Sequence, residues 1–257
     1  LLVVDRFSEG RKIPGKQGVG LARKIGTDIA CRLIHDGKIT SNWIHSTDAD
    51  VRLPEDYFRT PDAASNCSAL IYPFEHHCPD ATAQSSINFY DFKLRYYVAA
   101  LQWCGSGYGF HTIGSLICIN AAHYCQVRGF PKRSAAEDFY LLNKLAKVGQ
   151  VQTLQAPTIE IEARLSDRVP FGTGPALVGL QQIAEPITDY HLYHPSSFAD
   201  LRCWLSLTGA LWREQELYEQ QGLHLTLLKV VEILVVDALN EQPDQSREQA
   251  DRLFHVM

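Results

Sequence analysis

Apolar residues recur at every fourth position after a glycine-rich segment near the start of the chain. Four of them follow one another at this step: Leu21, Ile25, Ile29 and Leu33. Residues spaced in this way lie on one face of an α-helix. The pattern therefore predicts an amphipathic helix over residues 19–34, with Gly37 at its end.

The rest of the chain alternates short apolar runs with longer segments of helical spacing. We expect strands at residues 1–5, 40–46, 114–120, 151–154 and 158–163. We expect helices at residues 85–104, 121–127 and 134–148, a helix that starts at Pro54, and helical structure from residue 187 onward. Residues 62–81 and 164–174 have no clear period and are expected to be irregular.

Strands that alternate with helices predict an α/β fold with a mainly parallel sheet flanked by helices. We place the α/β domain at residues 1–186 and a helical C-terminal extension at residues 187–257. The helices of this extension carry enough apolar surface to pack on the domain or to join two copies as a homo-oligomer.

Composition and charge narrow the classes of protein. The chain has 257 residues, 46% hydrophobic and 21% charged, which is enough to bury a core. Lys and Arg number 24 and Asp and Glu 29, so the net charge of −5 argues against nucleic acid as a partner. The most apolar later stretch, residues 223–239, is interrupted by charged side chains, so no integral membrane span is expected.

Cysteine usage and the first residues bear on location and completeness. Seven cysteines without a C-x-x-C pair predict reduced thiols and a cytoplasmic protein. Cys67, His76, His77 and Cys78 are metal-ligand types, but their spacing fits no standard zinc finger. The chain opens on an apolar run without an initiator Met or a signal peptide, so we expect a fragment of a longer protein.

The most informative acidic pair is Asp48-Ala49-Asp50, directly after an expected strand. Ligands of open α/β sheets bind beyond the carboxyl ends of strands. Asp50 and Asp48 at this place can hold Mg²⁺ or Mn²⁺, which in turn bridges substrate phosphates. An EF-hand is excluded because Arg52 and Leu53 stand where a ligand and a glycine are needed. The alternative is a solvated turn before a helix.

A second acidic pair opens the helix expected at residues 134–148. Ser134 and Glu137 have the spacing of a capping box, which gives Glu137 a structural explanation. Asp138 has no such explanation and is the better candidate for a general base. The alternative for Asp138 is a favourable charge at a helix N-terminus.

Two basic segments suit an anionic ligand. Residues 164–174 combine Arg164 and Arg168 with two glycines, which fits a diphosphate; the alternative is an exposed loop. Arg23 follows Gly18 and Gly20 at the start of the first helix and can face an anion. Three histidines are further candidates, and His191 and His194 could supply a third metal ligand: His111, His191 and His194.

Taken in order, three of these segments resemble a family-2-type glycosyltransferase of the GT-A fold. Residues 18–26 are similar to that family's Gly-x-x-x-Ala-Arg-Asn-x-Gly helix, with Lys24 in place of Asn. Asp48-Ala49-Asp50, followed by Leu53-Pro54, resembles its Asp-x-Asp motif. Residues 129–131, Gly-Phe-Pro, through Glu137-Asp138 resemble its Gly-Gly-Phe…Glu-Asp stretch. The likeness covers residues 18–149.

The resemblance implies a GT-A, Rossmann-like domain that moves a sugar from a nucleotide-sugar donor to a hydroxyl acceptor. It implies Mg²⁺ or Mn²⁺ on the donor diphosphate, held by Asp50 and Asp48, and Asp138 as the base, with Glu137 beside it as a second catalytic candidate. It also puts Arg23 and Arg168 near the donor phosphates. The acceptor is a small molecule or a lipid-linked sugar.

Two departures from the family keep alternatives open. Only residues 1–8 stand where the family has its first strand, first helix and nucleotide-base contact, so part of the donor site is expected to be missing. The family's Gln-x-x-Arg-Trp motif is also absent, which argues against a processive synthase. The rival interpretations are a sugar-phosphate nucleotidyltransferase, a glycosidase and a catalytically inactive interaction domain.

Overall fold

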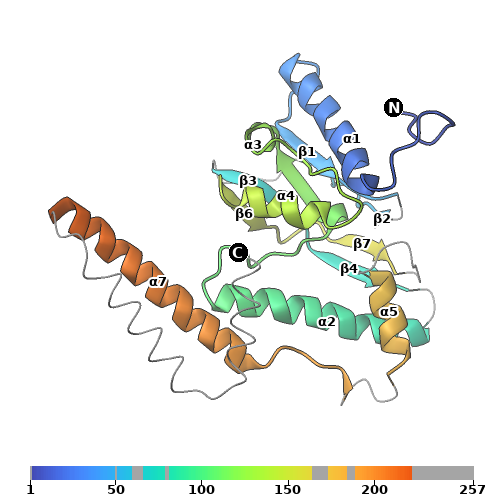
Figure 1. The fold of residues 1–257 in the computed structure, drawn as a ribbon. Coiled ribbons are helices and arrows are strands. Elements are labelled where there is room, and N and C mark those ends of the chain that lie inside the picture. Colours follow the sequence, from blue (N-terminus) through green and yellow to red (C-terminus); the bar gives the residue numbers. More distant parts are fainter. Residues whose placement is uncertain are drawn as a thin grey trace. The chain divides into compact units, whose positions relative to one another are not determined.

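The computed structural model describes residues 2–49, 51–59, 66–78, 81–163, 173–183 and 189–221. The chain divides into two compact units, residues 1–198 and 199–257. Both sheets belong to the first unit (Figure 1). Helix α7 (Pro195–Gln221) begins in the first unit and supplies the described part of the second. Among the described residues, no helix is both long and apolar enough to cross a membrane.

Four strands form the larger sheet, in the order β1, β5, β3, β6. They are β1 (Trp43–Ser46), β5 (Ile117–Asn120), β3 (Cys67–Ile71) and β6 (Gln150–Thr153). Strand β5 is antiparallel to both of its neighbours, and β3 is parallel to β6. Every residue of β3 is buried, as expected for the centre of a sheet that is covered on both faces.

A smaller sheet contains β2 (Val51–Arg52), β7 (Ile159–Glu162) and β4 (Phe74–His77), in that order. Strand β7 is antiparallel to β2 and parallel to β4. Its isoleucines are buried and its glutamates are exposed, so this strand has one core face and one solvent face.

The α/β class is confirmed, but the mainly parallel sheet is not observed. In the part of the chain that the structure describes, three strand pairings are antiparallel and two are parallel. The register explains the direction of β5: Ile117, at its start, lies opposite Ile71, at the end of β3. The intervening chain returns to the edge where β3 ends, so β5 must run back along β3.

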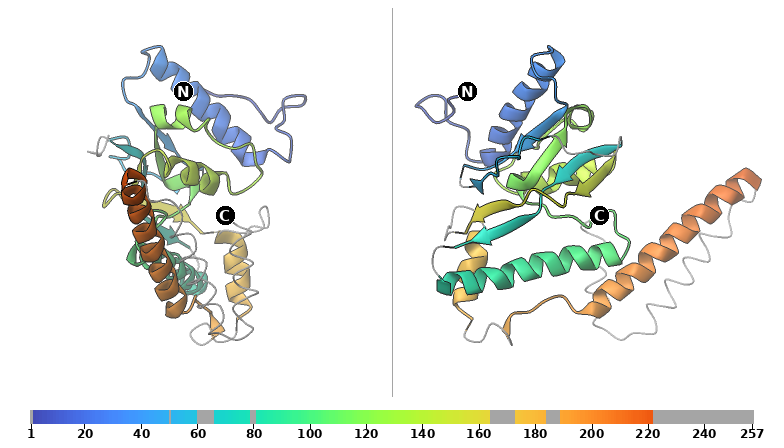
Figure 2. Two further views of the ribbon diagram at one scale, coloured as in Figure 1. Left: turned by 60° about the vertical axis from the view of Figure 1, so that its left-hand side comes forward. Right: turned by 180° about the vertical axis from the view of Figure 1, so that it is seen from behind.

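The helices pack around these sheets. Helix α1 (Gly18–His35) contacts β1, α3 (Ala121–Gln126) and α4 (Glu137–Leu145), and α4 contacts β3 and β6. Helix α2 (Ala81–Trp103) contacts β4 and α5 (Thr173–Gln181), and Figure 2 shows α2 and α5 together beside the smaller sheet. Three fully buried leucines anchor α4 in the core: Leu141, Leu142 and Leu145.

Most helices expected from the periodicity are present. Helix α1 ends as predicted, with Gly37 in the left-handed region at φ +68°. Helix α3 is capped by Asn120, whose side chain accepts hydrogen bonds from the backbone N–H groups of Ala122 and His123.

Several expected elements are wrong. Residues 2–6 are not a strand, and residues 55–58 are turns rather than a helix that starts at Pro54. The segment expected to be irregular contains β3 and β4, and helix α5 was not expected at all. The predicted capping box is also wrong, because α4 begins at Glu137 and its N-cap, Ala136, provides no side-chain hydrogen bond.

Candidate functional site

The guanidinium of Arg23 joins three elements that lie far apart in the sequence. Its Nε lies 2.9 Å from Oε1 of Glu137, at the start of α4. One terminal nitrogen donates to Oγ of Ser46 at 2.8 Å, and the other lies 2.7 Å from Oδ1 of Asp48. Nε and both terminal nitrogens of Arg23 thus each contact a side-chain oxygen, and the Arg23 side chain is only 9% exposed.

Two glycines allow this approach. The backbone N–H of Gly20 donates to the carbonyl of Arg133 at 2.9 Å, and a Cβ at Gly20 would lie 2.6 Å from that oxygen. A Cβ at Gly114 would lie 2.5 Å from a terminal nitrogen of Arg23. Helix α1 and the turn before β5 therefore require glycine at these places if Arg23 is to keep its three partners.

The two partner carboxylates of Arg23 differ in exposure. The side chain of Glu137 is 6% exposed, whereas that of Asp48 is 44% exposed. The buried carboxylate of Glu137 holds the guanidinium of Arg23 in place, so Glu137 is a positioning group in this geometry. No described residue donates a hydrogen bond to the second oxygen of Asp48.

Asp138 follows Glu137 in the first turn of α4. Its Oδ1 accepts a hydrogen bond from the backbone N–H of Phe139 at 2.7 Å. Burial, and secondly the negative charge of Glu137, raise the pKa of Asp138 to about 6. A carboxyl group with such a pKa is suited to exchange a proton near neutral pH.

A cavity of about 1400 Å³ brings these groups together. Its lining includes Arg23, Asp48, Glu137 and Asp138, so the structure unites four of the residues singled out from the sequence. His111 also lines this cavity, and its ring makes an edge-to-face contact with the ring of Phe74. Burial, with the charge of Arg95 as a further cause, lowers the pKa of His111 to about 4, so this imidazole is neutral at pH 7.

Other predicted site residues lie elsewhere. Asp50 and Arg168 lie outside the described residues. His191 is exposed and is not among the described residues that line the cavity. His194 is exposed and its Nδ1 lies 2.8 Å from Oγ of Ser196. Within the described ranges, no group of three or more His, Cys, Asp or Glu side chains is placed to hold a metal ion.

One buried cluster was missed by the sequence analysis. Nδ1 of His76 lies 2.5 Å from Asp91, and Nε2 lies 3.1 Å from the hydroxyl of Thr173, which lines the cavity. The pairing occupies both ring nitrogens of His76, so this residue is not free for the zinc cluster considered above. No local signal in the sequence pointed to this cluster, because residues 62–81 show no clear period and the partners of His76 are 15 and 97 residues away.

No model of a protein family, no curated protein and no solved structure matches the chain. Fold and site together define an α/β protein with a large cavity, whose described lining includes three carboxylic side chains, those of Asp48, Glu137 and Asp138.

Proposed function

We propose that the chain is a glycosyltransferase domain of the GT-A type, which moves a sugar from a nucleotide-sugar donor to a hydroxyl acceptor. The observation that carries the proposal is the position of Asp138, whose pKa is raised to about 6, in the cavity that Asp48 also lines. The three resembling segments supply one wall group each, namely Arg23, Asp48 and the Glu137–Asp138 pair.

In this mechanism, ionised Asp138 accepts the proton of the acceptor hydroxyl while that oxygen attacks the anomeric carbon of the donor sugar. The new bond joins the acceptor oxygen to the anomeric carbon, and the bond from that carbon to the diphosphate oxygen breaks. Arg23 acts as a positioning residue, because its guanidinium is already engaged with Glu137, Ser46 and Asp48.

The donor set of the cavity is compatible with a divalent cation. Mg²⁺ and Mn²⁺ bind through one or two carboxylates together with substrate phosphates. Asp48 offers one open carboxylate oxygen, and Asp50 is two residues further along the chain. A cation held there would neutralise charge on the departing diphosphate.

The test combines binding and transfer. Calorimetric titration with a panel of nucleoside diphosphates, with and without Mn²⁺, should show Mn²⁺-dependent binding of one nucleotide. Asp50→Asn should abolish it, whereas Asp138→Asn should retain binding and lose transfer. The kcat/KM of transfer should rise with pH through about 6, because only the ionised carboxylate of Asp138 accepts a proton.

Each result separates the proposal from its rivals. Release of pyrophosphate would identify a nucleotidyltransferase instead. Binding of no nucleotide would overturn the transferase proposal and favour a domain that acts by protein contact. Unchanged transfer in Asp138→Asn would remove Asp138 as the base.

A further inference from the structure

A second cavity, of about 490 Å³, lies between α2, α5 and residues 190–193. Its wall is formed by tyrosines and aliphatic side chains, among them Leu94, Leu180 and Ile183. Lys93 is the one charged side chain among the described residues that line it, and its ammonium lies 5.0 Å from the ring centre of Tyr190. This composition favours an apolar ligand over a polar one.

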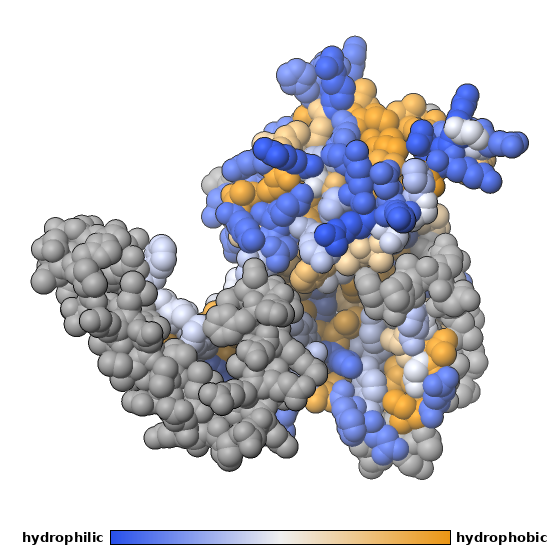
Figure 3. Space-filling view, in the orientation of Figure 1, coloured by the Kyte–Doolittle hydropathy of each residue, from blue (hydrophilic) through white to orange (hydrophobic). Residues whose placement is uncertain are grey.

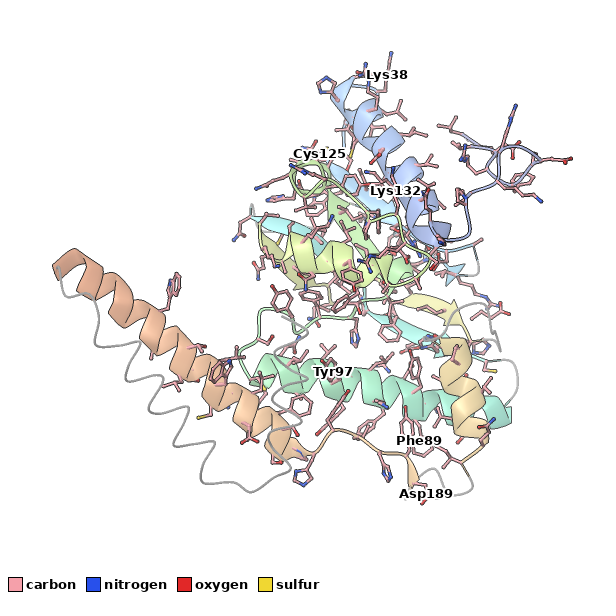
Figure 4. All side chains as sticks on the ribbon, in the orientation of Figure 1. Lys38, Phe89, Tyr97, Cys125, Lys132 and Asp189 are labelled. Carbon is pink, nitrogen blue, oxygen red and sulfur yellow. The ribbon has the colours of Figure 1, made fainter. Side chains whose placement is uncertain are left out.

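The second cavity adjoins the one that contains Asp138. Four residues line both: Tyr90, Leu94, Tyr97 and Ala176. Three of them lie on α2, along which Figure 4 labels Phe89 and Tyr97. A ligand with two parts can therefore place a polar part near Asp138 and an apolar part between α2 and α5.

The tyrosines do not make the second cavity ionic. Burial raises the pKa of Tyr90 to about 12, and burial also raises the pKa values of Tyr97 and Tyr190. The hydroxyl of Tyr96 donates to the backbone carbonyl of Tyr193 at 2.8 Å. Their rings thus act as a neutral apolar wall at pH 7.

We infer that this second cavity holds the apolar chain of an amphipathic acceptor whose reacting hydroxyl enters the cavity of Asp138. The inference rests on the proposed function and specifies its acceptor class: a lipid-linked or alkyl-bearing hydroxyl compound rather than a fully polar sugar. The apolar wall contributes by removing the chain from water, and the shared residues connect the chain to its polar head.

The chain offers a matched pair of variants. Gly179 lines the second cavity on α5, and a Cβ added there meets no atom within 4 Å. We therefore expect Gly179→Leu to add side-chain volume at the lining of the cavity without a clash at its Cβ. Gly26 on α1 has equally open space around a Cβ, is exposed, and lies outside both linings, so Gly26→Leu is the control.

The probe is a series of n-alkyl β-glucosides from methyl to hexyl, titrated by calorimetry without donor and below the concentration at which they form micelles. The association constant should rise about fourfold for each buried methylene until the cavity is full. Gly179→Leu should remove this dependence on chain length, and Gly26→Leu should keep it. If Gly179→Leu has a lower Tm than the wild type, Ile183→Asn replaces it in the titration. The same loss of the dependence on chain length is expected.

Equal affinity for the methyl and hexyl glucosides, or an unchanged dependence in both cavity variants, would overturn the inference. Because the titration needs neither nucleotide nor metal, its failure is distinct from failure of the proposed function. Nucleotide binding and Asp138-dependent transfer without a chain-length effect would leave the transferase standing with a polar acceptor.

Discussion

A single guanidinium, that of Arg23, holds two carboxylates whose exposure differs sevenfold, since Glu137 is 6% and Asp48 is 44% exposed. Substitution of the buried partner, Glu137, leaves the buried guanidinium paired with the exposed carboxylate of Asp48, whereas substitution of Asp48 leaves the buried ion pair with Glu137 intact. The two ion pairs are therefore expected to differ in their contribution to stability.

We predict that Glu137→Gln lowers the free energy of unfolding by about 2–4 kcal/mol and that Asp48→Asn lowers it by less than about 1 kcal/mol. Urea denaturation of the two variants beside the wild type measures both values. Equal losses would show that the ion pair with Glu137 has no special role in holding α1 against α4.

Individual residues were predictable where the chemistry is local. Asp48, Glu137 and Asp138 could be chosen because their neighbours in the sequence mark the end of a strand and the start of a helix, and the structure places all three at one cavity. The role of Arg23 was not predictable, because its partners lie 23, 25 and 114 residues away. The capping box failed because Ala136 takes the left-handed conformation, φ 59°, and Ser134 lies outside the helix.

At the scale of elements, the site depends on how closely α1 approaches the segment before α4. The contact at Gly20 is between backbones, since its N–H donates to the carbonyl of Arg133 at 2.9 Å. A backbone cannot move aside as the end of a side chain can. A methyl group at Gly20 must therefore displace the whole helix and, with it, Arg23.

We predict that Gly20→Ala lowers the free energy of unfolding by at least about 2 kcal/mol. Gly26→Ala, on the same helix but in open space, should raise it by about 0.5–1 kcal/mol, because alanine is the better helix former. Thermal and urea unfolding of both variants test this. Stabilisation by Gly20→Ala would contradict the close approach of α1 to residues 131–134.

Helices were easier to predict than strands for a physical reason. Helix α1 has four apolar residues at steps of four over eighteen residues, which is a long and regular signal. Strand β3 is five residues long and buried on both faces, so it has no alternation by which to recognise it. Strand β4 does alternate, but over only four residues, between Pro73 and Cys78.

At the scale of the whole molecule, periodicity carries no information on strand direction, and the expected mainly parallel sheet was wrong for that reason. Direction depends on which edge the chain reaches after α2, and this is a tertiary property. The structure describes residues up to 221, so the predicted joining of two copies through the C-terminal helices stays a prediction, as does the cytoplasmic location.

On the face shown in Figure 3, hydrophobic residues form separate patches between hydrophilic ones.

The larger cavity draws its wall from α1, α2, α4, α5 and the loops that join them to the sheets. A ligand in it therefore binds only when most of the first unit, residues 1–198, is folded. Binding to the native state alone stabilises it by about 2.7 kcal/mol at a ligand concentration one hundred times Kd. For a unit of this size, each kcal/mol corresponds to about 2–4 °C in Tm.

We accordingly predict that the bound nucleoside diphosphate, with Mn²⁺, raises the Tm of the first unit by about 5–10 °C at one hundred times its Kd. Asp138→Asn should keep the shift, because it removes a base and no phosphate or metal contact, whereas Asp48→Asn should reduce it. Scanning calorimetry, with Mn²⁺ alone as the control, measures the effect. A shift that is equal for Mn²⁺ alone would mean that the metal acts without a nucleotide, and a shift in a transition that belongs to residues 199–257 would place the ligand outside this cavity.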